Sequence, residues 1–269
     1  MTETPVDFDN VIVRLAENAD EIEAAQKVRY QVFYDEHGAK PDEETAKTKI
    51  DKDDYDAYAD HLVVVDRNDG TDKIVGTYRL LRQSKAEEYG QFYSDDEYDL
   101  SVLKNSDLSL LELGRSCVLP PYRVRHVLNH LWQHIADYIT EHKIDVMMGC
   151  ASLHGTNVEE LSQALSFLHH ANLAPEELRV KALPERYVDM NIIAEDELDR
   201  RKIFAELPPL VKGYIRLGAV IGEGAVIDEQ FNTTDIFIIV QTHLVTDKYR
   251  KHYERKLNKT LHGSGEKEE

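Results

Sequence analysis

Apolar residues along the chain follow two kinds of spacing, and these spacings predict an order of strands and helices. Short runs of consecutive or alternating apolar residues predict strands, whereas apolar positions three and four residues apart predict helices. The predicted strands are 11–16, 61–66, 73–82, 109–119, 145–151 and 234–242. The predicted helices are 21–34, 122–141, 158–170 and 208–218. Strands mixed with helices in this order predict an α/β fold.

Polar and special residues mark the ends of several of these elements. Asp20 is placed to cap the first helix, since a carboxylate before the first turn accepts its free N–H groups. Asn68-Asp69-Gly70 separates two strand runs and predicts a β-hairpin. Pro208 and Gly218 bracket the last predicted helix at the ends where these residue types are favoured.

Two acidic segments, at about 36–59 and 85–107, interrupt the pattern with few aliphatic residues. We expect both to be inserted loops, the first of them a mobile loop or lid. The sequence shows neither an internal repeat nor a convincing linker. Residues 1–245 are therefore predicted to form a single domain, followed by a basic C-terminal tail over 246–269.

Composition narrows the function classes. The chain has 269 residues, of which 42% are hydrophobic, and its net charge is −19. These values describe a folded chain that is poorly suited to binding nucleic acid, because it would approach a polyanion. We found no apolar run long enough for a membrane span and no signal peptide at the N-terminus. Cys117 and Cys150 lie in apolar runs and are expected to be buried thiols, so we predict a cytoplasmic protein.

The tail contains a basic amphipathic pattern over 248–261. Tyr249, Tyr253, Leu257 and Leu261 recur at four-residue spacing among basic residues. Two interpretations stay open: a helix that lies on the anionic inner membrane, and a docked helix with a solvated face.

The strand at 110–118 carries two charges in an apolar setting, Glu112 and Arg115. Burying either charge costs several kcal/mol unless it is paired. The two side chains would point to opposite faces of an unbroken strand, and a bulge would change this. A structural ion pair and a catalytic pair both fit this pattern.

Arg123 and Arg125 stand where this strand gives way to a helix. A helix N-terminus attracts anions, and arginine adds bidentate donors for a phosphate. A solvated basic turn is the alternative. His126, His130 and His134 form a stripe on the same helix, but the stripe lacks the glutamate of a zinc protease motif, so we predict no metal site.

Several short motifs occur in order along the chain. They are Val28-Arg29-Tyr30-Gln31-Val32-Phe33, Gly38-Ala39-Lys40-Pro41, Asp60-His61-Leu62, Gly76-Thr77-Tyr78-Arg79-Leu80-Leu81, Glu112-Leu113-Gly114-Arg115-Ser116-Cys117-Val118-Leu119-Pro120, Tyr122-Arg123-Val124-Arg125, Gly149-Cys150-Ala151-Ser152 and Leu210-Val211-Lys212-Gly213-Tyr214-Ile215-Arg216-Leu217-Gly218-Ala219. As an ordered set they resemble the acyltransferase branch of the GNAT superfamily. The resemblance is greater to the ornithine Nα-acyltransferase family, and it extends from about Arg29 to Gln241.

This resemblance implies a central twisted mixed β-sheet flanked by α-helices. It implies transfer of a 3-hydroxyacyl group from acyl carrier protein to the α-amine of L-ornithine, which yields a lyso-ornithine lipid. The acyl carrier protein thioester is then the donor substrate, and no bound cofactor is expected.

The resemblance also implies roles for individual residues. Glu112 would be the general base, with Arg115 beside it, and strand N–H groups near Leu113 and Ser116 would bind the oxyanion. The pantetheine arm would pair along this strand as far as Val118, with its phosphate on Arg123 and Arg125. The resemblance implies acceptor contacts by Arg29, Phe33, Asp53, Asp56 and Arg79. By charge, acids among Asp53, Asp54, Asp56 and Asp60 suit the δ-ammonium, and Arg29 or Arg79 suits the carboxylate. A structural ion-pair network of the same residues is the alternative that stays open.

Two departures from related patterns refine the expected substrates. Acyl-homoserine lactone synthases, which the chain resembles more distantly, carry a Trp where this chain has Ala39, which argues against lactone production. The turn Arg123-Val124-Arg125-His126 contains no glycine, which favours the single phosphodiester of a carrier protein over coenzyme A. Two alternatives stay open: another amino-acid or homoserine-derived acceptor, and a non-catalytic module that binds an acyl carrier or a lipid surface.

Overall fold

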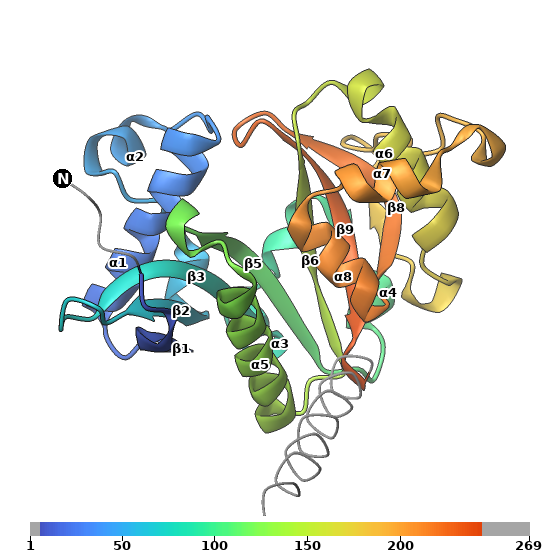
Figure 1. Ribbon diagram of the computed structural model, residues 1–269. Coiled ribbons are helices and arrows are strands. Elements are labelled where there is room, and N and C mark those ends of the chain that lie inside the picture. Colours follow the sequence, from blue (N-terminus) through green and yellow to red (C-terminus); the bar gives the residue numbers. More distant parts are fainter. Residues whose placement is uncertain (1–5, 244–269) are drawn as a thin grey trace, which may run out of the picture.

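The computed structural model describes residues 6–243, and its strands form one mixed sheet (Figure 1). The order across the sheet is β1-β2-β3-β5-β6-β9-β8-β7-β4. The strands are β1 Val11–Leu15, β2 Asp60–Asp66, β3 Lys73–Arg82, β4 Tyr98–Asp99, β5 Leu110–Val118, β6 Val146–His154, β7 Lys181–Ala182, β8 Val220–Asp228 and β9 Thr233–Gln241. All six predicted strands are present. Strand β8 was not predicted, because Gly222, Glu223 and Gly224 interrupt its apolar pattern.

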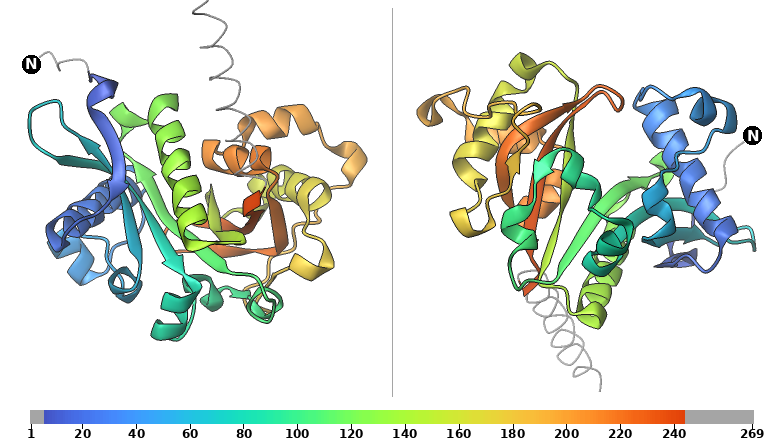
Figure 2. Two further views of the ribbon diagram at one scale, coloured as in Figure 1. Left: turned by 90° about the horizontal axis from the view of Figure 1, so that it is seen from below. Right: turned by 180° about the vertical axis from the view of Figure 1, so that it is seen from behind.

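Helices cover both faces of this sheet. The helices are α1 Ala19–Tyr30, α2 Glu43–Thr48, α3 Gln83–Tyr89, α4 Ser101–Lys104, α5 Arg125–His142, α6 Val158–Asn172, α7 Arg200–Glu206 and α8 Pro209–Leu217. Helices α1 and α5 lie on opposite faces of the β1–β3 half (Figure 2). Helix α1 continues into a π-helical segment, Gln31–Glu36, which carries the chain toward the centre of the sheet.

The predicted cap of the first helix was wrong by two residues. The side-chain oxygen of Asn18 accepts the backbone N–H of Glu21 at 3.0 Å, so Asn18 is the N-cap. Asp20 lies in the first turn instead, where its charge favours the positive end of the helix dipole.

The acidic segments are folded, contrary to the prediction of loops. Segment 36–59 contains α2 and a 3₁₀ turn, and it buries Asp51 and Asp56. Segment 85–107 contains short helices and strand β4, and it buries Tyr98 against Phe237 of β9. Scarcity of aliphatic residues misled the prediction, because aromatic side chains and paired charges hold these segments in place.

The sheet splits between its two central strands. Strands β5 and β6 are parallel, and their pairing runs from Leu110–Val146 to Glu112–Met148 before the strands separate (Figure 1). Gly149 follows at once with φ +143°, and a Cβ there would lie 2.4 Å from the carbonyl oxygen of Leu113. The close approach of the two backbones therefore requires glycine at this position.

We expect Gly149→Ala to destabilise the protein by about 1–3 kcal/mol, because alanine is strained at this φ and overlaps the Leu113 carbonyl. Gly213→Ala is the matched control: Gly213 lies inside α8 with open space around its Cβ, so alanine should stabilise by about 0.5–1 kcal/mol. Urea unfolding of both variants measures the difference. Equal stability of the two variants would contradict the close approach.

In residues 6–243 we find no helix that is both long and apolar enough to cross a membrane. The basic pattern predicted over 248–261 lies outside the described residues.

Candidate active site

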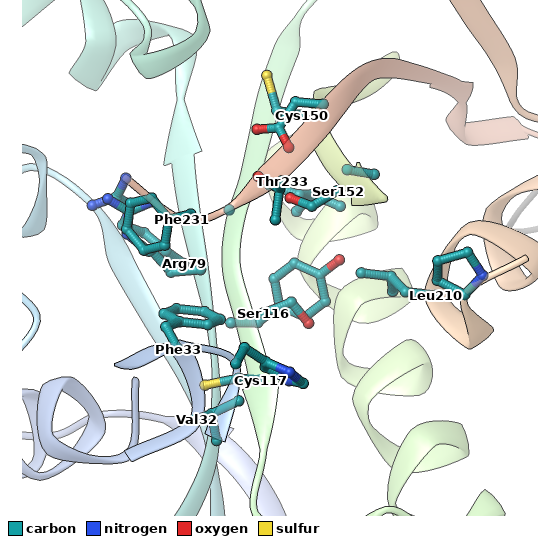
Figure 3. A pocket seen from close by; sticks show the side chains of 18 of the residues that line it. Val32, Phe33, Arg79, Ser116, Cys117, Cys150, Ser152, Leu210, Phe231 and Thr233 are labelled. Carbon is teal, nitrogen blue, oxygen red and sulfur yellow. The ribbon is translucent and has the colours of Figure 1, made fainter. Parts of the chain in front are cut away.

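A cavity of about 430 Å³ occupies the split between β5 and β6. Its walls come from the π-helical segment, from β3, β5, β6 and β9, and from the start of α8 (Figure 3). The predicted site residues that line it are Phe33, Arg79, Glu112, Leu113, Arg115, Ser116, Val118 and Arg123.

A β-bulge in β5 gives the site its shape. The register against β3 shifts between Thr77 and Arg79, and Arg115 on the bulge has a left-handed φ of 50°. In a regular strand the side chains of Glu112 and Arg115 would point to opposite faces of the sheet, and the bulge removes this restriction. Both side chains consequently line the cavity, and beyond Glu112 the β5 backbone edge no longer pairs with β6.

Glu112 is a buried carboxyl group with three donors. Its oxygens accept the backbone N–H of Tyr93 at 2.8 Å and that of Ser94 at 2.9 Å, and the Ser94 hydroxyl donates to Oε1 at 2.5 Å. Burial raises the pKa of Glu112 above its ordinary value, and these hydrogen bonds oppose that rise. The result is a carboxylate held at one orientation in a poorly solvated place, as a general base requires.

Three arginines and three aspartates form a paired network beside the cavity. Arg29 Nε lies 2.6 Å from Asp51, and Arg29 Nη1 lies 2.8 Å from Asp56. Arg79 bridges Asp53 and Asp56, and Arg115 Nη2 lies 3.2 Å from Asp53. The charges of the network balance, so its aspartates are already neutralised.

This network revises the predicted acceptor residues. Among the described residues that line the cavity, Arg29, Asp53, Asp54 and Asp56 are missing, while Arg79 and Phe33 are present. Asp60 pairs elsewhere, with Arg82 at 3.2 Å and with the Tyr138 hydroxyl. In this structure Asp53, Asp56 and Asp60 pair with arginines, and all the predicted aspartates lie outside the cavity lining, so their contact with the acceptor stays a prediction.

Aromatic rings fix the two cavity arginines. The guanidinium of Arg115 lies 4.9 Å from the ring centres of both Tyr93 and Phe231, and that of Arg79 lies 5.3 Å from Tyr93. Phe33 meets Phe231 edge to face at 5.9 Å. Contact with the aromatic rings holds the two guanidinium groups at the cavity and shields them partly from water.

Of the two arginines predicted to bind phosphate, one lies at the far end of the cavity. Arg123 lines the cavity, and its guanidinium is held by Glu36 at 2.5 and 2.6 Å. Arg125 is exposed at the start of α5 and does not belong to the lining of the described cavity. The sequence could not separate these two arginines because the turn between them decides which one faces inward.

Four cavity residues and neighbours were missed from the sequence: Ser94, Glu97, Cys150 and Asp235. Ser94 and Glu97 come from the segment predicted to be a loop, while Cys150 and Asp235 lie on β6 and β9. No spacing in the chain relates these positions. Cys150 was predicted to be a buried thiol; it is half-buried, and both cysteines are free.

Known proteins are similar to this chain over most of its length. The model of the acetyltransferase (GNAT) domain matches residues 28–133. The chain is 42% identical over 260 residues to L-ornithine Nα-acyltransferase of Rhodobacter capsulatus, covering 96% of this chain and 98% of that one. It is 45% identical over 252 residues to the enzyme of that name from Brucella abortus, covering 92% and 90%. A solved CoA-dependent acyl-homoserine lactone synthase aligns with a TM-score of 0.48 at 12% identity, covering 90% and 88%.

The family comparison confirms both the predicted resemblance and the predicted acyltransferase fold. The identity extends over nearly the whole length of the chain and of its relatives. The chain therefore belongs to the L-ornithine Nα-acyltransferase family of GNAT acyltransferases.

Proposed function

We propose that this protein transfers a 3-hydroxyacyl group from the thioester of acyl carrier protein to the α-amine of L-ornithine. The product is a lyso-ornithine lipid, and the reaction is the first step of ornithine lipid synthesis. The observation that carries the proposal is the buried Glu112 carboxylate at the point where β5 separates from β6. The relatives are named L-ornithine Nα-acyltransferases, which supports ornithine as the acceptor.

The reaction is aminolysis in a ternary complex, with direct attack and no acyl-enzyme. The α-amine nitrogen forms a bond to the thioester carbon, and the carbon–sulfur bond breaks. The ammonium loses two protons as it becomes an amide N–H; one proton ends on the departing thiol sulfur and the other is released. Glu112 accepts the first proton, a step worth about 10²–10⁴-fold in rate when the base is well placed.

The bulged part of β5 supplies the second requirement, stabilisation of the oxyanion. Beyond Glu112 this strand edge faces the cavity, and its backbone N–H groups are suited to donate to the developing negative charge. The same edge offers a pantetheine arm the hydrogen bonds of an added β-strand. Leu113, Ser116 and Val118 line this side of the cavity.

The N-terminus of α5 supports a phosphate at the mouth of the cavity. Its N-cap, Val124, makes no side-chain hydrogen bond to the free N–H groups of the first turn. Arg123 lies directly before it and lines the cavity. One phosphodiester fits this arrangement, because the turn lacks the glycine that a close approach to pyrophosphate favours.

The test is release of free thiol from 3-hydroxyacyl carrier protein, with and without ornithine, followed by mass spectrometry. We expect release with ornithine only, and a product whose mass is one water below the sum of ornithine and the 3-hydroxy acid. Fragmentation should place the acyl group on the α-nitrogen. Release with other amines but not ornithine would change the acceptor, and binding of the carrier protein without release would indicate a non-catalytic module.

We expect Arg123→Ala to raise the KM for acyl carrier protein by about tenfold, because it removes a charge-assisted contact with phosphate. Glu36→Gln should lower the KM for acyl carrier protein. Glu36 forms an ion pair with the Arg123 guanidinium, and it therefore competes with the phosphate for this group. Steady-state thiol release measures both. An unchanged donor KM in Arg123→Ala would remove the phosphate role of this residue.

A further inference from the structure

A second acidic group lies at the edge of the same cavity. Ser152 on β6 lies opposite Asp235 on β9 in the strand register. Alternation places Cys150 on the same face as Ser152, and Figure 3 shows both among the residues that line the pocket. Glu97 reaches this face from the start of β4. The carboxylate oxygens of Glu97 and Asp235 and the sulfur of Cys150 lie within 4.8 Å of one another.

Asp235 has an acid oxygen without a partner. The residue is 7% exposed and lines the cavity, and among residues 6–243 its Oδ1 has no hydrogen-bond partner. A buried carboxylate oxygen left in this way costs free energy, which a cationic ligand would recover. Ser152 and Thr233 hydrogen-bond to the same carboxyl group, so Oδ1 is the oxygen that is placed to receive a cationic ligand.

The group is short of positive charge. Arg186 lies 3.4 Å from Glu97, and Asp228 adds a further negative charge. The charge of Arg115 also acts on Asp235, but this guanidinium is already paired with Asp51 and Asp53. Burial and the negative charge of Asp235 raise the pKa of Glu97 to about 7. Burial and the negative charge of Asp228 raise the pKa of Asp235 to about 6, against hydrogen bonds from Ser152 and Thr233. The Asp51–Asp53–Asp56 network differs in this respect, since three arginines neutralise its three acids.

Two neutral side chains connect this acidic pair to the proposed base. The Ser94 hydroxyl lies 2.5 Å from Glu112 and 3.4 Å from the Cys150 sulfur. The Cys150 thiol in turn donates to Glu97 at 3.2 Å. Three successive contacts therefore connect Glu112 with the acidic pair, and Ser94, Cys150, Glu112 and Asp235 all line the same cavity.

We propose that Asp235, together with Glu97, binds the distal ammonium group of the amino-acid acceptor while its α-amine lies at Glu112. This inference rests on the proposed function and adds the side-chain subsite of the acceptor. Two carboxylates keep the distal amine protonated, because nearby negative charge favours the cationic form. A protonated amine has no lone pair for attack, so the subsite also directs acylation to the α-nitrogen.

The experiment compares two acceptors on purified full-length protein. L-Norvaline has the carbon skeleton of ornithine without the δ-amine. We expect the wild type to prefer ornithine strongly. Asp235→Asn should lower kcat/KM for ornithine by about 30-fold or more, as expected when one member of a buried charge pair is lost, and leave that for norvaline nearly unchanged. Glu97→Gln should have the same direction of effect.

Glu223→Gln on β8 is the matched control, because Glu223 pairs with Lys181 and does not belong to the lining of the described cavity. Its ornithine preference should equal that of the wild type. Thermal melting checks that each variant folds, and if Asp235→Asn does not fold, the wild-type preference and Glu97→Gln decide the question.

The outcomes separate this inference from the proposed function. Equal losses for ornithine and norvaline in Asp235→Asn would show a structural role and overturn the subsite. Equal use of both acceptors by the wild type would overturn the subsite while the acyltransferase activity stands. Stoichiometric zinc in the purified wild type, lost in Asp235→Asn, would assign the group to a metal instead. Absence of ornithine acylation by the wild type would overturn the proposed function and the subsite with it.

Discussion

Glu112→Gln is expected to lower kcat for acyl transfer by about 10²–10⁴-fold, with little change in the donor KM. The amide is close in size to the carboxyl group but cannot take a proton from the attacking ammonium. Thiol release at saturating ornithine measures the loss. We expect the residual rate to lose its dependence on the ionisation of this side chain.

The pH profile provides an independent measurement of the same role. Burial raises the pKa of Glu112, and a base acts only when deprotonated. The wild-type rate should therefore fall as the pH is lowered through a pKa above that of an ordinary glutamate. Glu112→Gln should remove this acidic limb from the profile.

Glu141→Gln is the control, because it makes the same loss of one negative charge at an exposed position near the end of α5. It should retain wild-type turnover. Glu112 also anchors the Tyr93–Ser94 backbone, so each variant must be shown to fold by thermal melting. A folded Glu112→Gln protein with near-normal turnover would remove Glu112 as the base.

Arg29→Ala is expected to reduce the free energy of unfolding by about 3–5 kcal/mol, the largest stability effect that we predict. Arg29 is fully buried, and its removal leaves Asp51 and Asp56 without their nearest cation. Arg67→Ala is the control: its ion pair with Asp72 is exposed, so the loss should be about 0.2–1 kcal/mol. Urea unfolding of both variants gives the comparison.

The same network predicts how stability depends on pH. Arg29 and Arg79 hold the pKa of Asp56 well below its ordinary value against the opposing effect of burial. Asp56 therefore contributes stability at neutral pH, and this contribution is lost as the pH falls below the ordinary aspartate pKa. Arg29→Ala should flatten this acid limb. Equal acid sensitivity of the variant and the wild type would contradict the role assigned to the network.

Local sequence pattern was sufficient for most of the secondary structure. The runs at 61–66 and 73–82 formed the predicted hairpin, because apolar spacing and an Asn-Asp-Gly turn act over neighbouring residues. The ordered motifs also indicated the family. Strand β8 escaped prediction because its two glycines interrupt the apolar run.

The site divides in the same way. Glu112 and Arg115 were identifiable as charges in an apolar strand. The sequence indicated that a bulge would let both side chains point to the same side, but it did not show whether the bulge exists. For Asp53 and Asp56 both an acceptor site and a structural ion-pair network stayed open, because a sequence shows charges but not their partners. The fold pairs them with Arg29, Arg79 and Arg115 instead.

The sequence by itself determined the order of elements, the family and the strand that carries the proposed base, since each depends on neighbouring residues or ordered motifs. Tertiary structure alone decided which acids are fully paired with arginines and which are not. Glu97, Cys150 and Asp235 are separated by more than 50 positions and meet only because β4 folds toward the β6–β9 pair. Burial and charge balance belong to the folded molecule, and these two quantities single out Asp235.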